Sequence, residues 1–260
     1  MNLIKIYVIS LKDINDYIFT ENYNSIKNIS SNIILSKGVI PSKEICNKYY
    51  YIPESNLGCT LAHIKVWKNI KKSSKINNYE IKNYSIILED DAYLAINKNK
   101  FKSIIKKIIN KYGNKFHIYK LHSDFNNGFT STASYIINHK KLDETIKNTS
   151  IILGHIDFDL YIQNLLNKII IYTHHFNIFK TDETTSNARK NKYNILNIFD
   201  NIYLSSRSDK SLKHLLSYKV IKLYNYNFIV FELFIFFLLI ILILLNKKYI
   251  FLIIIIILLV

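Results

Sequence analysis

Three consecutive carboxylates, Glu89-Asp90-Asp91, follow the short apolar run at residues 85–88. Carboxylates at the end of a buried strand repel one another and lose hydration unless a cation or hydrogen-bond donors compensate. Hard cations such as Mg²⁺ and Mn²⁺ take one or two protein carboxylates and complete their coordination with phosphate oxygens and water. The pattern therefore predicts a divalent-cation site beside a phosphate-containing ligand. The alternative is a solvated acidic turn that begins the next loop.

The elements that must position these carboxylates alternate between strands and helices. Apolar runs predict strands at residues 4–11, 85–88, 116–121, 133–137 and 168–172. Apolar residues at helical spacing predict helices at residues 57–70, 101–112, 140–147 and 157–165. Residues 12–51 are polar and rich in asparagine, and no element is assigned to them. The alternation predicts an α/β domain with a largely parallel sheet, whose strand carboxyl ends form the ligand-binding edge.

Composition narrows the class of protein further. The 260 residues include 35 Lys and Arg against 19 Asp and Glu, a net charge of +16. Such a field favours anionic partners, for example nucleotide diphosphates or lipid headgroups, although the lysines form no single block. No nucleic-acid-binding motif is present, so a nucleic-acid partner is not expected. The two cysteines, Cys46 and Cys59, are too few for a disulfide framework or for the usual four-ligand zinc site.

Residues 228–260 form a hydrophobic tail of almost unbroken Ile, Leu and Phe. A helix from Phe228 to Leu245 would be about 27 Å long, close to the hydrocarbon thickness of about 30 Å. Its apolar residues outweigh the single charge of Glu232 on the insertion scale. We therefore expect a membrane anchor with its span at residues 228–245. With the residues that follow, this segment could form a hairpin, a tilted continuous helix, or one span plus an interfacial stub. Basic residues before this segment place the preceding domain on the cytoplasmic face of the membrane.

Several motifs occur in an order that is typical of one enzyme family. They are Val8-Ile9-Ser10-Leu11, Gly58-Cys59-Thr60-Leu61-Ala62-His63 with Trp67, Ile87-Leu88-Glu89-Asp90-Asp91-Ala92, Thr132-Ala133-Ser134-Tyr135-Ile136-Ile137 and Ile156-Asp157. In this order the chain resembles glycosyltransferase family 25, the lipopolysaccharide and lipooligosaccharide galactosyltransferases. The resemblance implies a GT-A type nucleotide-sugar fold with the catalytic domain at residues 1–187. Residues 188–227 are then a polar, basic connector, which could pack on the domain.

The resemblance also implies roles for the acidic triplet. Asp91 would be the main ligand of Mn²⁺ or Mg²⁺, with Glu89 or Asp90 assisting or holding the nucleotide ribose. His175, which follows His174 at the end of a predicted strand, is the candidate for a further metal ligand.

The nucleotide sugar, a UDP-sugar, is expected to contact the residues after the first strand. These residues are Ser10, Leu11 and Lys12, with Asp90 from the triplet. Lys12 is the one basic residue where the family usually has arginines. His63 matches a histidine of the family and either contributes to this site or is a satisfied structural histidine.

The implied reaction moves a sugar, such as galactose, to a glycolipid or polysaccharide acceptor in lipooligosaccharide or surface glycan biosynthesis. The cation neutralises the leaving nucleoside diphosphate, while a carboxylate accepts the proton of the attacking hydroxyl. Asp157 is the candidate base, with Asp159 as the second candidate, and the alternative role of Asp157 is a helix N-cap. The competing function is that of a noncatalytic, membrane-tethered basic domain, an inactive relative that binds anionic lipid or polymer.

Overall fold

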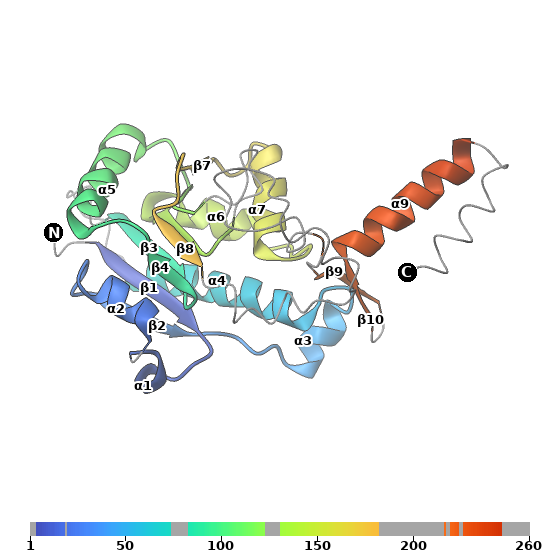
Figure 1. Cartoon of the computed structure of the whole chain (residues 1–260), viewed down its shortest axis with the longest axis horizontal. Helices are drawn as coiled ribbons and strands as arrows, with labels where there is room; N and C mark the ends of the chain where they lie inside the picture. The colour runs from blue at the N-terminus through green and yellow to red at the C-terminus, as the bar shows by residue number, and fades with distance from the viewer. Residues whose placement is uncertain are drawn as a thin grey trace.

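The computed structural model describes residues 4–18, 20–73, 83–122, 131–181, 216, 219–223 and 226–245 (Figure 1). In chain order the elements are β1 Lys5–Ser10, α1 Ile14–Tyr17, α2 Glu21–Lys27, β2 Ile33–Lys37, α3 Lys43–Lys48, α4 Glu54–Ser73, β3 Tyr84–Glu89, β4 Ala92–Leu94, α5 Lys98–Tyr112, β5 Ile118–Lys120, β6 Ser134–Asn138, the 3-10 helix η2 His139–Lys141, α6 Leu142–Asn148, α7 Ile156–Leu165, β7 Ile171–Thr173, β8 Phe179–Thr181, β9 Lys219–Leu223, β10 Tyr226–Ile229 and α9 Val230–Leu245. The predicted strands and helices of the first 173 residues are all present, with ends shifted by a few residues.

The central sheet has six strands in the order β2-β1-β3-β6-β5-β7. β1 runs parallel to β2 and to β3, and β5 runs parallel to β7. β6 is antiparallel to both of its neighbours, β3 and β5. The prediction of an α/β domain with a central sheet is confirmed, but the sheet is mixed rather than largely parallel. The carboxyl ends of β1 and β3 meet at one edge, as the acidic triplet requires.

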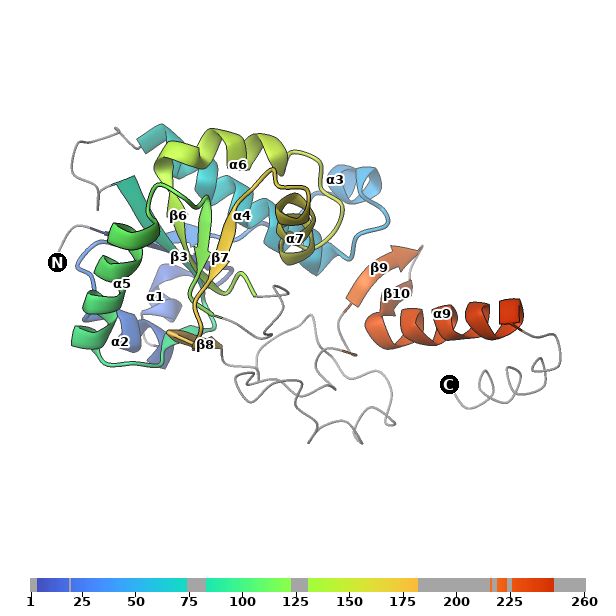
Figure 2. The same cartoon turned by 90° about the horizontal axis from the view of Figure 1, so that it is seen from above.

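Helices cover both faces of the sheet, and each face has its own apolar core. Seen from above, α1, α2 and α5 lie on one side, and α4, α6 and α7 lie on the other (Figure 2). Phe101 and Ile105 of α5 pack with Ile86 and Leu88 of β3 in the first core. The second core joins apolar residues of α4, including Trp67, to the opposite faces of β1, β3 and β6. Alternate residues of each strand thus face opposite helical layers, as the two-residue period of a strand requires.

A hairpin of β9 and β10 lies against the start of α4, far from it in the sequence. The Asn56 side chain donates a hydrogen bond to the Lys219 carbonyl at 2.7 Å. The backbone N–H of Lys222 donates to the Tyr51 carbonyl at 2.7 Å, and its ammonium lies 2.8 Å from Glu54 Oε1. This part of the predicted connector is therefore packed on the domain. Its residues 188–215, 217–218 and 224–225 lie outside the described residues.

The prediction of a membrane-spanning helix at residues 228–245 is wrong. Phe228 belongs to β10, which pairs antiparallel with β9, so α9 begins only at Val230. α9 has 16 residues to its end at Leu245, which gives about 24 Å against a hydrocarbon thickness of about 30 Å. In the part of the chain that the structure describes, no helix is long and apolar enough to cross a membrane. Residues 246–260 of the predicted anchor lie outside that part.

Candidate active site

The carboxyl ends of β1 and β3 open into a pocket of about 730 Å³. Because the two strands are parallel neighbours that pair Ile9 with Glu89, the residues that follow them emerge side by side. The pocket is bounded by residues 10–12, residues 38–41, the first turns of α4 and the acidic triplet. This is the edge at which open α/β sheets bind ligands. The predicted residues Ser10, Leu11 and Lys12 all line it.

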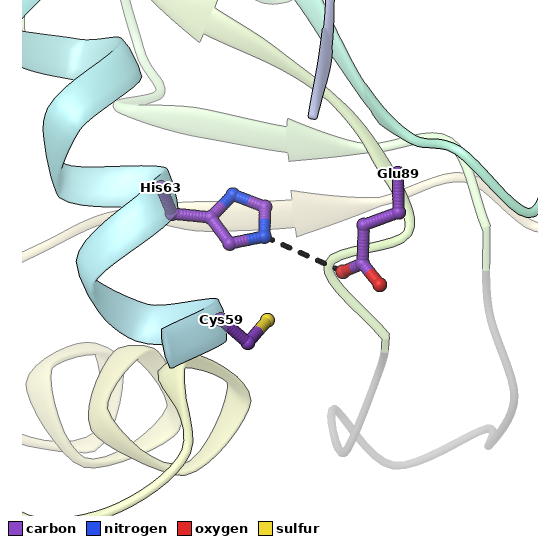
Figure 3. Close-up of side chains that lie close together, drawn as sticks. All are labelled: Cys59, His63 and Glu89. Atoms are coloured by element: carbon purple, nitrogen blue, oxygen red, sulfur yellow. Dashed lines mark hydrogen bonds and ion pairs between the residues drawn. The ribbon is translucent and has the colours of Figure 1, made fainter. Parts of the chain in front are cut away.

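Gly58 allows α4 to approach the pocket loop closely. A Cβ atom at this position would lie 2.6 Å from the Val39 carbonyl oxygen and 3.3 Å from Pro41 Cδ. The first contact is with backbone, so a larger residue would displace the loop. The close approach brings the next residue, Cys59, and one turn later His63 toward the end of β3 (Figure 3).

Glu89 is held through one of its two carboxylate oxygens. His63 Nε2 lies 3.4 Å from Glu89 Oε1, and the Thr132 hydroxyl donates to the same oxygen at 3.1 Å (Figure 3). Burial acts to raise the pKa of Glu89, but the hydrogen bond with His63 holds it below its usual range. Glu89 is therefore an ionised carboxylate that lines the pocket.

A buried chain of hydrogen bonds sets the tautomer of His63. Trp67 Nε1 donates to the Tyr135 hydroxyl at 2.8 Å, and this hydroxyl lies 2.8 Å from His63 Nδ1. Indole is only a donor, so the Tyr135 hydroxyl oxygen accepts from Trp67. Ionised Glu89 is only an acceptor, so a neutral His63 carries its hydrogen on Nε2 and donates it to Glu89, and its Nδ1 accepts the hydrogen of the Tyr135 hydroxyl. His63, predicted at the nucleotide-sugar site, is fully buried and reaches the pocket through Glu89.

Asp90 is tied to the end of β1. The Ser10 hydroxyl donates to Asp90 Oδ2 at 2.6 Å, and the same hydroxyl oxygen accepts from the Lys12 backbone at 2.9 Å. The Asn22 side chain donates to the Asp90 carbonyl at 3.0 Å. Burial raises the pKa of Asp90, and the Ser10 hydrogen bond opposes part of that rise. Asp90 thus joins the two strand ends, while Asp91 borders the pocket beside it.

Asp157 is not among the residues that line the pocket, but it is close enough to the cluster to interact electrostatically with Glu89, and it contacts a lysine and a histidine. Lys120 Nζ is 3.6 Å from its Oδ1, and His155 Nδ1 is 3.3 Å from its Oδ2. Burial acts to raise its pKa, but Lys120 and His155 hold it well below the usual range. Its charge in turn raises the pKa of Glu89 and of Cys59, so these groups share one electrostatic environment. Asp157 is therefore ionised at neutral pH.

The alternative role of Asp157 as a helix N-cap is wrong. The N-cap of α7 is His155, whose Nδ1 accepts a hydrogen bond from the Asp157 backbone N–H at 3.3 Å. Asp157 stands in the first turn of the helix, where its charge also suits the helix dipole. Its side chain is left to pair with Lys120.

Asp159 and His175 do not join the cluster. Asp159 is buried, and its Oδ1 accepts the backbone N–H groups of Leu153 at 3.0 Å and Gly154 at 3.1 Å. Burial raises the pKa of Asp159 to about 6. His175 packs its ring against His174 and Phe176, with centroids 4.5 and 4.7 Å apart, and is not among the pocket residues. Asp159 therefore holds the loop before α7, and His175 belongs to an aromatic cluster.

Two residues that contact Asp157 escaped the sequence analysis. Lys120 is almost completely buried in β5, and His155 precedes the motif that contains Asp157. A lone lysine within an apolar strand run was a usable signal, because a buried lysine almost always has a charged partner. Nothing local to His155 indicated that an imidazole, instead of Asp157, would cap α7.

The residues at the pocket fit a hard divalent cation that also binds phosphate. Within the described ranges, the group with three ligand atoms close together is Cys59, His63 and Glu89, whose atoms all lie within 4.8 Å of one another. Asp90 and Asp91 do not converge with Glu89 into a closed cage. All three residues of the triplet line the pocket, and Mg²⁺ or Mn²⁺ takes one or two protein carboxylates when phosphates supply other ligands.

Comparison with models of protein families gives a match over most of the chain. A family model described as glycosyltransferase family 25 (LPS biosynthesis protein) matches residues 3–173. No curated protein matches the chain.

Three solved structures among those that are similar are all glycosyltransferases. The first is a glycosyltransferase involved in glycosylation of the major capsid of PBCV-1, with 11% identity and a TM-score of 0.43, covering 66% of this chain and 81% of that one. The glycosyltransferase GlyE of Streptococcus pneumoniae TIGR4 has 13% identity and a TM-score of 0.39, covering 67% and 46%. A Drosophila galactosyltransferase 7 mutant in complex with manganese, UDP-Gal and xylobiose has 9% identity and a TM-score of 0.35, covering 68% and 69%.

Proposed function

The chain belongs to glycosyltransferase family 25, and we propose that it transfers galactose from a UDP-sugar to a glycan acceptor in lipopolysaccharide or lipooligosaccharide biosynthesis. The acceptor class follows from the description of the family as an LPS biosynthesis protein. The donor class follows from the family resemblance of the strand-end motifs.

The observation that carries the proposal is the pocket between β1 and β3. Its volume of about 730 Å³ falls within the range of about 300–1,000 Å³ for small-molecule sites. One wall is apolar, from Val39, Ile40 and Pro41, and suits a nucleobase. The lining also includes the acidic triplet, which suits a cation with its diphosphate. A nucleotide sugar has this same division between a flat base and a charged diphosphate.

We assign the cation to Glu89 and Asp91, both of which line the pocket. When bound, the cation neutralises the charge that develops on the departing diphosphate. His63 and Thr132 fix one oxygen of Glu89 and thereby orient the other. Asp90, bonded to Ser10, holds the two strand ends together at the floor of the site.

We assign the proton acceptor to Asp157. Lys120 and His155 keep its carboxylate ionised, so it can accept a hydrogen bond from an acceptor hydroxyl over the neutral pH range. As the hydroxyl oxygen bonds to the anomeric carbon, the bond from that carbon to the diphosphate breaks and the hydroxyl proton passes to Asp157. Because the pKa of Asp157 is lowered, the proton moves late, once the hydroxyl has become strongly acidic.

The test is a panel of UDP- and GDP-sugars incubated with the full chain, with and without Mn²⁺, followed by transfer to lipooligosaccharide acceptors. We expect cation-dependent binding and turnover of one UDP-sugar. Asp91→Asn should lose both, whereas the matched control Asp143→Asn, on an exposed part of α6, should keep them. Cation-independent binding of many polyanions with a steep salt dependence would instead support the noncatalytic basic domain.

A further inference from the structure

Cys59 and His63 lie one turn apart on α4 and both point toward Glu89 (Figure 3). Their ligand atoms, Sγ, Nε2 and Oε, all lie within 4.8 Å of one another. Residues four apart share a helix face, so the backbone of α4 holds the sulfur and the nitrogen on the same side. Cys59 and Glu89 line the pocket, which gives a cation from solvent access to them.

This donor set differs in chemistry from the acidic triplet. A thiolate and an imidazole favour Zn²⁺, whereas Mg²⁺ and Mn²⁺ favour oxygen ligands. Zn²⁺ bonds to sulfur at about 2.3 Å and to nitrogen or oxygen at about 2.0–2.2 Å. In a tetrahedron these bonds separate a nitrogen from an oxygen ligand by about 3.4 Å and a sulfur from either by about 3.6 Å. The observed distance from His63 Nε2 to Glu89 Oε1 is 3.4 Å.

The surroundings complete the site. When Nε2 of His63 binds a cation, the ring hydrogen moves to Nδ1, which lies 2.8 Å from the Tyr135 hydroxyl oxygen. The Tyr135 hydroxyl oxygen can then accept this ring N–H, the role that a carboxylate, a backbone carbonyl or water has beside most histidines that bind metals. One thiolate and one carboxylate neutralise the two charges of Zn²⁺, so the occupied site carries no net charge. The thiol proton of Cys59 is released to solvent when the cation binds.

We propose that Cys59, His63 and Glu89 form a zinc site with its fourth position open to the pocket, and that Zn²⁺ bound there inhibits the enzyme. Zn²⁺ would take Glu89 away from the catalytic cation and fill space beside the diphosphate. The binding part stands on the geometry of the three residues alone. The inhibition part rests on the proposed function.

Cobalt substitution tests the binding part directly. Co²⁺ bound by a thiolate gives a sulfur-to-metal charge-transfer absorption in the near ultraviolet, and added Zn²⁺ should remove it. We expect this band for the wild-type chain and for Cys46→Ser, which changes the other free cysteine, and no band for Cys59→Ser. Zn²⁺ affinity by calorimetry should fall at least roughly tenfold in Cys59→Ser, as even the loss of an outer-shell partner has that effect. A wild-type chain without the band, or a Cys59→Ser chain that keeps it, would overturn the zinc site.

A second measurement uses only the wild-type chain and does not depend on how a variant folds. Zn²⁺ should slow the alkylation of Cys59 by iodoacetamide, followed by peptide mass spectrometry, and leave Cys46 unaffected. Equal rates at Cys59 with and without Zn²⁺ would contradict the proposal. Inhibition is then scored in the Mn²⁺-dependent assay, with each chain compared to its own rate without Zn²⁺. A chain that shows the cobalt band but no transfer with any sugar would count against the proposed function and leave the zinc site standing.

Discussion

Replacement of Asp159 by asparagine should stabilise the protein at neutral pH and leave sugar transfer in place. The asparagine oxygen can still accept the backbone N–H groups of Leu153 and Gly154, which Asp159 Oδ1 now accepts. Within the described residues, Asp159 Oδ2 and Gln163 Oε1 are both buried without a hydrogen-bond partner. These two residues are four apart on α7 and therefore neighbours on its surface. An amide at position 159 brings a donor to this pair of acceptors.

The size of the effect follows from the pKa of Asp159. Burial raises it from 3.8 in the unfolded chain to about 6 in the folded one. Between these values the folded state holds more protons than the unfolded state, so stability falls as the pH rises through this window. Above it the full unfavourable contribution is present, about two pKa units at about 1.4 kcal/mol each, or about 3 kcal/mol. Asn removes this contribution, so we expect the free energy of unfolding to rise by roughly 1–3 kcal/mol at pH 7.

Urea unfolding at several pH values between about 4 and 8 measures the effect as the difference between the two chains. The advantage of Asp159→Asn should be small at the acidic end and should grow until the pH exceeds about 6. Turnover should be near that of the wild type. Asp157→Asn is the matched control two residues away, and its turnover should fall by about 10²–10⁴-fold. If Asp159→Asn lost turnover as Asp157→Asn does, or were the less stable chain at pH 7, the structural role of Asp159 would be refuted.

Three further substitutions test the pocket. Asp91→Asn should lower Mn²⁺-dependent turnover by about 100-fold or more, because cation stabilisation of the leaving group is worth several kcal/mol; an unchanged rate with normal unfolding would remove Asp91 from the site. Gly58→Ala places a Cβ 2.6 Å from the Val39 carbonyl oxygen and should lower the free energy of unfolding by about 1–3 kcal/mol, measured in urea. The KM for the donor should rise, and an unaltered KM would show that the loop does not shape the pocket. Tyr135→Phe leaves the buried Trp67 N–H without its acceptor, which should destabilise the fold by about 1–3 kcal/mol and lower kcat through Glu89; a variant as stable as the wild type would contradict the hydrogen-bond chain.

The elements that carry large apolar residues were predictable, and the short polar ones were not. Trp67 and Ile70 mark α4, and Phe101 and Ile105 mark α5, because their helical spacing reflects a buried face. By contrast, α1 and α3 have four and six residues, and α3 has no buried residue at all. Such short segments are fixed by what they contact and leave little periodic signal in the sequence.

The direction of a strand and the ends of a helix were also not predictable from the sequence pattern. An apolar run such as β6 is buried equally well in either direction, so its antiparallel pairing with β3 depends on partners elsewhere in the chain. Phe228 and Ile229 are as apolar as the residues of α9, yet they pair with β9 instead. Composition predicted an apolar segment correctly, but it could not divide that segment between a strand and a helix.

The acidic residues of the candidate site were predicted from the sequence, but the residues that contact them were not. Glu89, Asp90 and Asp91 stand together in the sequence at the end of an apolar run, so their place at the sheet edge followed from local pattern. The contact between Lys120 and Asp157 joins residues that are distant in the sequence. The same is true of the hydrogen bond between His63 and Tyr135. No local rule gives such pairings, although a buried lysine signals that one exists.

The hairpin of β9 and β10 supports the pocket from a part of the chain that is distant in the sequence. Glu54 and Ser55 line the pocket, and Lys222 of the hairpin contacts Glu54 across more than half the chain. A shortened protein that stops at residue 187 would keep every acid of the triplet and lose the brace behind that wall. A chain that ends at residue 187 should therefore bind the donor more weakly, although its set of acidic residues is intact.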